Sequence, residues 1–412
     1  MKIPPRPPFL GGLGGFKGNF LPQLRSSMIF FFLFLAIFLY LAAEKILHEK
    51  RLKRIPIRIH VNGTRGKSAV TRLIAAALRQ AGIRTLAKTT GTTPRLILPD
   101  GKEETIRRRG PARILEQIHF IRRAAELQTE AVVVECMAID PAFQFISETK
   151  MIRSTIGVIT NVRPDHLETM GETLDDIAES LSRTIPSGGI LITADRRYYP
   201  FFEAIAGTKQ TNVFLVDSPS SDFPDFCPGN FIFPENIGIA EKVCSFLGLN
   251  PGIVSASLNE GPFIREGAGV FQIAVGGKRV SFVDAFSAND VDSTRIIQER
   301  AAAQAPCPRP WVALFNNRAD RPRRLQSFAD ALFGGDKYDY IALTGEGRDP
   351  AQRHIRRKAP WDRVFSLKNR VPEKLLEELL QIIPAQELTI VGMGNDKGPG
   401  RLLSRFLRGA SS

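Results

Sequence analysis

The stretch from Arg58 to Thr71, read RIHVNGTRGKSAVT, constrains the fold of this chain more than any other. Alternating apolar residues lead into it and indicate a buried strand, and from Ala69 onward the spacing is that of a helix. Gly63 and Gly66 permit a tight turn between these two elements. Free backbone N–H groups and the positive end of the helix dipole attract an anion to such a turn. We therefore predict a phosphate-binding loop formed by Gly63, Thr64, Arg65, Gly66, Lys67 and Ser68.

Two side chains carry the chemistry expected of this loop. Lys67 supplies a mobile cation for phosphate, and the Ser68 hydroxyl is suited to the shell of Mg2+. The ordinary P-loop has a glycine five positions before Gly66, where this chain has Val61, so the loop is a shorter form. A glycine-lysine-serine match also occurs at ordinary helix starts, and the rest of the chain must decide between the two interpretations.

Length and charge limit the classes of function. A chain of 412 residues is long enough for two or three domains. The net charge of +14 predicts an anionic partner, such as a nucleotide, a lipid surface or an acidic product. No zinc-finger or aromatic RNA-binding signature accompanies the basic residues, so nucleic acid is not expected. The four cysteines are scattered without a CxxC pair and indicate a reducing compartment.

The N-terminal region predicts a membrane anchor. Residues 1–20 are rich in Pro and Gly and are expected to form a disordered tail. The uncharged stretch at residues 26–43 is just long enough to span a bilayer. We place the anchor at residues 21–44. A cleaved signal peptide is the alternative, because Ala42 and Ala43 are small enough for a processing site. Basic residues flank both ends, but ATP is abundant only inside the cell, so the part after the anchor is expected in the cytoplasm.

The rest of the chain predicts an α/β fold with mainly parallel sheets and helices on both faces, because short apolar runs alternate with amphipathic stretches. Strands are expected at residues 55–62, 131–136, 155–161 and 189–193, and helices at 67–80, 112–127, 174–185 and 236–246. A hairpin at 270–284 precedes strands at 311–316, 338–344 and 388–391 and helices at 325–332 and 374–383. We divide this part into a central ATP-binding domain at 45–283 and a C-terminal Rossmann-like domain at 284–412. The turn at Gly392–Asn395 is either a weak phosphate-loop signal or a tight connection.

Polar side chains follow two of the expected strands, at the sheet edge where ligands bind in such folds. Glu135 ends an apolar strand, and a carboxylate there requires a cation or a donor, which makes it a candidate for the magnesium shell. The alternative is a Glu that merely reaches solvent. Asn161, Asp165 and His166 follow the next strand, and His166 is a candidate metal ligand or general base, with a structural role as its alternative.

GTRGKS, Glu135 and the later NVRPDH form an ordered set that resembles the ATP-dependent amide ligases of the Mur and folylpolyglutamate synthase superfamily. The sequences at 88–92, 135–137 and 316–321, read KTTGT, ECM and NNRADR, resemble the ligase subunit of poly-γ-glutamate synthases, CapB or PgsB, more closely still. The resemblance implies that Lys67 and Ser68 hold the phosphates of ATP, and that Asn236 contacts adenine. It also implies that Glu135 and His166 bind Mg2+.

The resemblance further implies a reaction. The enzyme would be an ADP-forming ligase that joins glutamate through its γ-carboxyl into a growing poly-γ-glutamate chain, through an acyl phosphate, with small membrane subunits as partners. The alternatives are a Mur or folate-type ligase with another acceptor, and a membrane-tethered nucleotide-binding scaffold. Many Mur ligases carry a carbamylated lysine on the helix after the Asp-His pair. Residues 174–185 contain no lysine and place Ser182 near that position, so a second Mg2+ held through a carbamate is not expected.

An arginine cluster follows the strand expected at 311–316 and should lie at the same edge of the second sheet. Arg318 and Arg321 match the NRADR motif, and we expect them to act in catalysis by binding substrate carboxylate in a bidentate manner. Arg323 and Arg324 are expected to be surface charge. The alternative for the whole cluster is a solvated helix start.

Overall fold

The computed structural model describes residues 20–91, 94–108, 110–216, 226–227, 230–258 and 268–410, without the side chains of residues 20–27, 226–227, 230–231 and 410. The chain divides into two units, residues 1–53 and residues 54–412.

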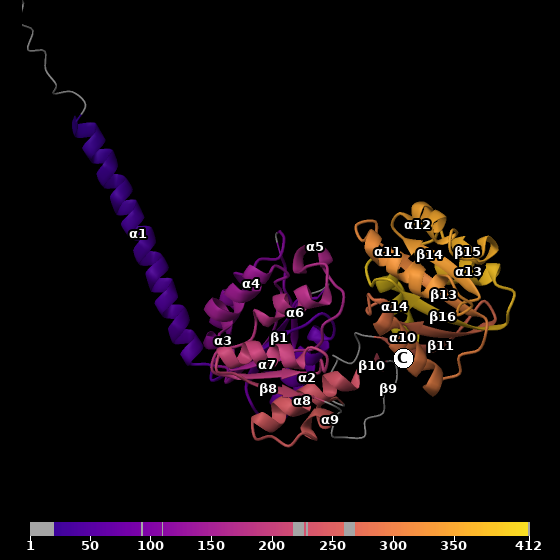
Figure 1. The fold of residues 1–412 in the computed structure, drawn as a ribbon, viewed down its shortest axis with the longest axis horizontal. Helices are drawn as coiled ribbons and strands as arrows, with labels where there is room; N and C mark the ends of the chain where they lie inside the picture. The colour runs from indigo at the N-terminus through magenta and orange to yellow at the C-terminus, as the bar shows by residue number, and fades with distance from the viewer. Residues whose placement is uncertain are drawn as a thin grey trace, which may run out of the picture. The chain divides into compact units, whose positions relative to one another are not determined.

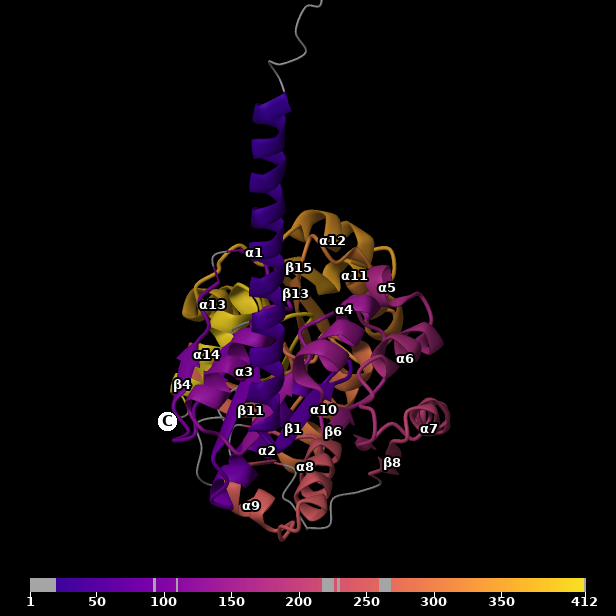
Figure 2. The ribbon, with the colours of Figure 1, turned by 90° about the vertical axis from the view of Figure 1, so that its left-hand side faces the viewer.

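The first unit contains the helix α1 (Phe20–Lys53), which Figure 2 shows as one continuous helix. The large apolar side chains from Met28 to Leu41 are exposed, whereas a core helix of a soluble protein would bury them. Within the described residues, the segment Met28–Lys53 is the helix long and apolar enough to cross a membrane. The anchor predicted at 21–44 lies inside α1, and the helix continues to Lys53. The predicted tail lies outside the described residues except for Phe20.

The second unit begins with an eight-stranded sheet in the order β4-β3-β2-β5-β1-β6-β7-β8. In chain order its strands are β1 (Ile57–Asn62), β2 (Thr85–Thr89), β3 (Arg95–Ile97), β4 (Glu103–Thr105), β5 (Ala131–Glu135), β6 (Ile156–Ile159), β7 (Ile190–Thr193) and β8 (Asn212–Leu215). The strands are parallel except β3 and β4, which form an antiparallel edge. Val61 pairs with Glu135 and Asn62 with Ile159, so β1, β5 and β6 end side by side. The segments that follow these three strands therefore meet at one edge of the sheet.

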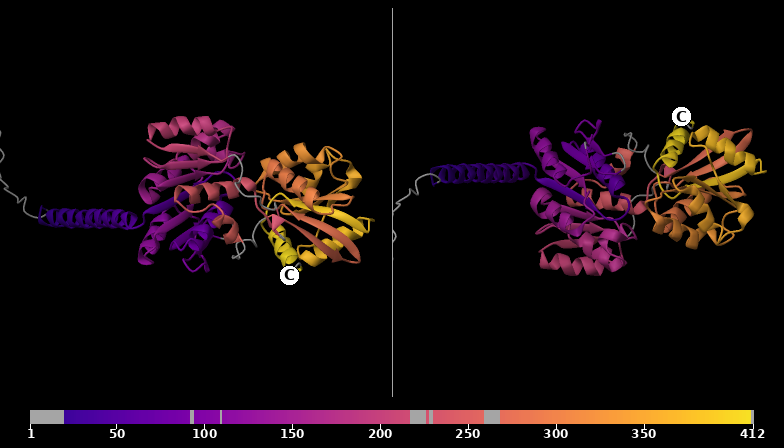
Figure 3. Two further views of the ribbon diagram at one scale, coloured as in Figure 1. Left: turned by 90° about the horizontal axis from the view of Figure 1, so that it is seen from below. Right: turned by 90° about the horizontal axis from the view of Figure 1, so that it is seen from above.

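Helices cover both faces of this sheet, as Figures 1 and 3 show in purple to pink. They are α2 (Lys67–Gln80), α3 (Glu116–Glu126), α4 (Pro141–Ile146), the π-helix η1 (Ser147–Ile152), α5 (Leu167–Met170), α6 (Leu174–Ser182), α7 (Tyr199–Thr208), α8 (Pro234–Phe246) and α9 (Ile253–Leu258). On one face, Val61 and Val158 pack with Leu73 of α2 and Val243 of α8. On the other, Ile159 and its neighbours pack with α6 and α7. Successive side chains of β6 thus point into the two opposite cores, as expected for a strand that is buried on both faces.

A second sheet of six strands has the order β11-β12-β16-β13-β14-β15. Its strands are β11 (Gly269–Val275), β12 (Lys278–Asp284), β13 (Trp311–Asn317), β14 (Tyr340–Gly345), β15 (Val364–Ser366) and β16 (Glu387–Met393). Its helices are α10 (Val291–Gln304), α11 (Pro322–Phe328), the π-helix η3 (Ala329–Phe333), α12 (Arg348–Ile355), the 3-10 helix η4 (Trp361–Arg363), α13 (Pro372–Ile382) and α14 (Pro399–Ala410). A two-stranded sheet, β9 (Phe226–Cys227) with β10 (Asn230–Phe231), precedes it along the chain.

The second sheet is also buried on both faces. Phe315 and Leu343 pack against Phe328 and Ile297 on one side, where α11 and α10 lie. Leu314 and Ile390 belong to the opposite core, which contains α13 and α14.

The turn after β16 is fixed by reciprocal amide contacts. Asn316 donates through Nδ2 to the Asn395 backbone oxygen at 2.7 Å, and the Asn395 amide donates back to the Asn316 backbone oxygen. These contacts favour the interpretation of Gly392–Asn395 as a tight connection.

The predicted α/β class with parallel sheets is confirmed, and the anchor segment is helical. The hairpin predicted at 270–284 is present as β11 and β12, and β12 pairs in parallel with β16. Strand pairing therefore attaches the hairpin to the second sheet. The domain division at residue 283 stays a prediction.

Candidate active site

The loop between β1 and α2 has the backbone that only glycine adopts readily at two positions. Gly63 has φ 124° and Gly66 has φ 83°. A Cβ at Gly63 would lie 2.1 Å from Thr160 Oγ1, and one at Gly66 would lie 2.7 Å from Asn236 Oδ1. Both glycines are therefore required by conformation and by close approach. The N-terminus of α2 begins directly at Lys67, which is the arrangement that binds phosphate in nucleotide-binding loops.

Glu135 and Ser68 meet beside this loop. Ser68 Oγ donates a hydrogen bond to Glu135 Oε2 at 2.7 Å, and the Thr90 backbone N–H donates to the same oxygen at 2.8 Å. Glu135 is only 3% exposed, so the alternative in which it merely reaches solvent is wrong. A buried carboxylate beside a hydroxyl at the start of a phosphate loop is the donor set that suits Mg2+. These residues fit the cation that the sequence predicts.

Lys67 and Asn236 flank the same loop. Lys67 Nζ donates to the Gly63 backbone oxygen at 2.6 Å, and Lys67 lines a pocket of about 210 Å³ that also borders Gly63 and Thr64. Asn236 lies on α8 and is buried, with its amide against Gly66. The structure therefore brings Asn236 to the phosphate loop, although it lies far away in the sequence. Its contact with adenine stays a prediction.

Asp165 and His166 follow β6 and line the same pocket as Lys67. His166 has φ 47° and is the N-cap residue of α5. Its Nε2 lies 4.0 Å from Asp165 Oδ2. Burial lowers the pKa of His166 against the opposing effect of Asp165, which favours the neutral imidazole that acts as a ligand or a base.

The predicted metal set of Ser68, Glu135 and His166 is only partly assembled. Ser68 and Glu135 are hydrogen-bonded, whereas no contact joins His166 to either of them among the described residues. Within the same part of the chain, no three His, Cys, Asp or Glu side chains lie close enough together to hold a metal ion. The role of His166 as a ligand stays a prediction.

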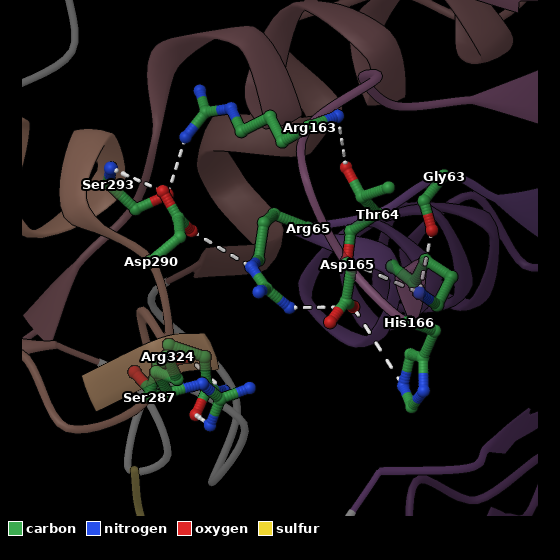
Figure 4. Close-up of polar contacts among 12 residues, drawn as sticks. Gly63, Thr64, Arg65, Arg163, Asp165, His166, Ser287, Asp290, Ser293 and Arg324 are labelled. Atoms are coloured by element: carbon green, nitrogen blue, oxygen red, sulfur yellow. Dashed lines mark hydrogen bonds and ion pairs between the residues drawn. The ribbon is translucent and has the colours of Figure 1, made fainter. Parts of the chain in front are cut away.

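Arg65 joins the phosphate loop to α10, as Figure 4 shows. Its guanidinium lies 3.0 Å from Asp165 Oδ2 and 2.9 Å from Asp290 Oδ2. Burial lowers the pKa of Arg65, but the two carboxylates outweigh burial and raise it. In this arrangement Arg65 fixes the phosphate loop to Asp165 and Asp290. The predicted contact of Arg65 with nucleotide stays a prediction.

Sequence reasoning missed Asp290. It is the N-cap of α10, where its side chain accepts from the Ser293 backbone N–H at 2.8 Å. An Asp followed three residues later by Ser293, ahead of a helical stretch, was the local signal for that cap. Its pairing with Arg65, 225 residues away, had no local signal.

The arginines of the cluster after β13 differ in their contacts and in their exposure. Arg321 donates to Glu168 at 2.8 Å, and its Nη2 lies 3.4 Å from His166 Nδ1, so it reaches the residues after β6. Arg318 pairs with its neighbour Asp320 at 2.9 Å. Arg323 is 63% exposed, in agreement with surface charge.

Arg324 departs from the prediction of surface charge. It donates to Asn289 Oδ1 at 3.0 Å and to the Gly394 backbone oxygen at 3.2 Å. Burial, followed by repulsion from Arg65, lowers the pKa of Arg324 to about 10. The expectation for Arg324 is therefore wrong, because its guanidinium is half-buried and hydrogen-bonded to Asn289 and to the turn after β16.

Two family models match different parts of the chain. Residues 61–222 match the Mur ligase middle domain, and residues 270–410 match the C-terminal domain of poly-gamma-glutamate synthase CapB. The first match contains the phosphate loop, Glu135 and His166. The second contains β11 to β16 and the arginine cluster.

Comparison with solved structures shows the same fold. Escherichia coli FolC in complex with DHPP and ADP superimposes with a TM-score of 0.59 at 13% identity, over 88% of this chain and 92% of that chain. A bifunctional folylpolyglutamate synthase/dihydrofolate synthase from Yersinia pestis, complexed with AMPPNP and Mn ion, gives a TM-score of 0.61 at 14% identity, over 88% of this chain and 92% of that chain. At these identities the likeness establishes the fold alone.

Two curated relatives match at higher identity. The capsule biosynthesis protein CapB of Bacillus anthracis is 35% identical over 338 residues, which is 79% of this chain and 71% of that protein. The PGA synthase CapB of Bacillus subtilis is 34% identical over 361 residues, which is 86% of this chain and 91% of that protein. The chain therefore belongs to the CapB family of poly-γ-glutamate synthases, and it is an ATP-dependent amide ligase with a Mur ligase middle domain.

Proposed function

We propose that this enzyme polymerises glutamate through its γ-carboxyl, forming an acyl phosphate and releasing ADP and phosphate. The observation that carries the proposal is the Ser68–Glu135 pair beside the phosphate loop. A buried carboxylate and a hydroxyl there suit ATP with Mg2+, and membership of the CapB family supports glutamate as the amino acid.

The first step is attack of the γ-carboxylate oxygen of the acyl substrate on the γ-phosphorus of ATP, with departure of ADP. The loop N–H groups at the start of α2 and the Lys67 ammonium stabilise the phosphate charge during this step. Ser68 and Glu135 would hold Mg2+, which supplies further charge neutralisation when bound.

The second step is attack of the amine of the other substrate on the acyl carbonyl carbon, with loss of phosphate. A neutral His166 would take the proton that the amine loses, and its position in the lining of the pocket beside Lys67 supports this role. Arg318 and Arg321 are fixed cations for the carboxylates of the acidic substrate, and Arg321 reaches the His166 imidazole.

Location and partners follow from the same proposal. The exposed apolar helix α1 would hold the enzyme in the cell membrane, with residues after it in the cytoplasm where ATP is available. Small membrane subunits would complete a synthase that passes the polymer on.

The test uses the full-length protein in membranes, with ATP, Mg2+ and one amino acid at a time. Hydroxylamine traps an acyl phosphate as a hydroxamate, so glutamate should give glutamyl hydroxamate and an equal amount of ADP. Lys67→Ala should lower this rate roughly 100-fold or more, with its free energy of unfolding changed by about 0.5 kcal/mol or less. Formation of AMP and pyrophosphate, or ligation of another amino acid in place of glutamate, would contradict the proposal.

A further inference from the structure

A cluster of three charged residues, Lys88, Arg108 and Glu116, lies outside the phosphate loop, and its Arg108 lines the pocket. Lys88 on β2 is 1% exposed, and its Nζ lies 3.2 Å from Glu116 Oε2 at the start of α3. The same carboxylate receives two hydrogen bonds from Arg108, from Nε at 2.7 Å and from Nη2 at 3.0 Å. Lys88 also donates to Gln117 Oε1 at 3.1 Å. One carboxylate is thus shared by two cations.

Glu116 is the carboxylate that contacts both cations, and Glu135 lies near enough to Lys88 to raise its pKa. Burial lowers the pKa of Lys88 to about 8, with Glu116 acting in the opposite direction, so Lys88 is mainly protonated at neutral pH. Glu116 stays ionised, because the effects of Arg108 and Lys88 outweigh burial and lower its pKa. Lys88 and Glu116 are therefore both charged, and this pair holds the carboxylate against which Arg108 is fixed.

Arg108 has a free edge for that ligand. A guanidinium carries five N–H donors, and Glu116 occupies the edge formed by Nε and Nη2. Among the residues that the structure describes, Nη1 has no hydrogen-bond partner. The edge made by Nη1 and the second Nη2 hydrogen is therefore available to a carboxylate, in the bidentate geometry that arginine favours.

The pocket connects this edge with the reaction. Arg108 and Lys67 both line the cavity of about 210 Å³, together with Met137, Ala138 and Ile139. The cavity thus has two cationic groups on its wall and an apolar stretch from the segment after β5, and its one carboxylate among the described residues, Asp165, is paired with Arg65. A glutamyl residue matches this lining, since two carboxylates flank a short aliphatic chain.

We infer that Arg108 binds the α-carboxylate of the glutamyl residue whose γ-carboxyl is activated, and that Glu116 and Lys88 are positioning residues for Arg108. The inference rests on the proposed function. On this inference, the acidic acyl substrate is recognised by the central sheet domain. This site is separate from the arginine cluster after β13.

The experiment compares two substrates that differ only in the α-carboxylate. 4-Aminobutanoate retains the γ-carboxyl and the amine of glutamate but lacks the α-carboxylate. Hydroxamate formation is measured with full-length wild type, Arg108→Gln and Arg108→Lys. The matched control is Arg122→Gln, which removes the same charge from α3 at a side chain that is 57% exposed. Thermal unfolding checks the fold of each variant, and we expect Lys88 to stay paired with Glu116 when Arg108 is replaced.

We expect Arg108→Gln to raise the KM for glutamate roughly 10- to 100-fold, the loss expected for a hydrogen-bonded charge pair. The KM for ATP and the KM for 4-aminobutanoate should stay unchanged, Arg108→Lys should show a smaller rise, and Arg122→Gln should behave as wild type. Equal effects of Arg108→Gln on both substrates, an equal rise in the KM for ATP, or equal effects of both glutamine variants would overturn the inference.

The proposed function can fail separately. If wild type gives no glutamyl hydroxamate, calorimetric binding of L-glutamate and of 4-aminobutanoate still tests the subsite, since binding requires no turnover. Weaker binding of L-glutamate in Arg108→Gln, without a change for 4-aminobutanoate, would support the subsite. Identical binding to wild type and Arg108→Gln would overturn it.

Discussion

At the residue scale, Arg321 is the arginine of its cluster that contacts His166 on the wall of the pocket. It contacts Glu168 and His166, whereas Arg323 is 63% exposed and pairs only weakly with Glu172 at 3.6 Å. We expect Arg321→Gln to raise the KM for the acidic substrate or lower kcat by roughly tenfold, the loss of one charged hydrogen bond. Steady-state kinetics of both variants provide the measurement.

Arg323→Gln is the matched control for that change and should leave both constants within about twofold of wild type. Arg324 is unsuitable as a control, because it is hydrogen-bonded to Asn289 and Gly394. Equal, small effects of Arg321→Gln and Arg323→Gln would show that the cluster is only a solvated face.

His60 provides a prediction of pH dependence at the same scale. It is buried on β1, with Nδ1 2.8 Å from Glu148 Oε2. Burial lowers the pKa of His60, but the effects of Cys136 and of the Glu148 carboxylate outweigh burial and raise it from 6.5 to about 9. The folded state therefore holds this proton more tightly than the unfolded state. The resulting stabilisation is complete below pH 6.5 and is lost as the pH rises through about 9.

The stability difference should be on the order of 3 kcal/mol for the full shift. Denaturant unfolding of the full chain in detergent, between pH 6 and pH 10, measures it. Glu148→Gln should be less stable than wild type at low pH and should show a flatter decline. Parallel pH profiles for the two proteins would refute the assignment to His60.

At the element scale, the turn from β1 into α2 depends on the conformation of Gly66. Gly66→Ala introduces a Cβ at positive φ and 2.7 Å from Asn236 Oδ1. We expect a loss of about 1–2 kcal/mol in stability and weaker ATP binding, because the loop must shift. Calorimetric titration with AMPPNP provides the measurement.

Gly82→Ala separates backbone strain from loop geometry. Gly82 also has positive φ, at 80°, but a Cβ there would meet nothing within 4 Å. This variant should lose a similar amount of stability and bind AMPPNP as wild type does. Equal affinities for wild type and Gly66→Ala would show that the loop is not the nucleotide site.

At the scale of the whole molecule, α1 is expected to hold the enzyme in the membrane with residues 55–412 in the cytoplasm. The reason is the exposed apolar surface of Met28–Lys53 together with the need for ATP. In sealed right-side-out cells, external protease should leave residues 55–412 intact, and permeabilised cells serve as the control. Release of the whole chain by mild salt would contradict an anchor.

The sequence by itself determined the α/β class and the chemistry of the phosphate loop. Both are local properties: apolar alternation specifies strands such as β1, and glycine at positions 63 and 66 specifies the turn into α2. The helix predicted at 67–80 matches α2, Lys67–Gln80. The short edge strands β3 and β4 carry little periodicity, and they were not predicted.

Only the tertiary structure decided which polar groups meet. Ser68 and Glu135 are 67 residues apart, and they touch because β1 and β5 are neighbours in the sheet. Packing of α3 beside β2 also brings Lys88 to the Glu116 carboxylate that Arg108 contacts. Arg65 reaches Asp290 over 225 residues, and Arg324 is hydrogen-bonded to the turn after β16. The local sequence predicts which side chains follow a strand. It does not predict which strands pair, because the order of strands in a sheet depends on the packing of the whole chain.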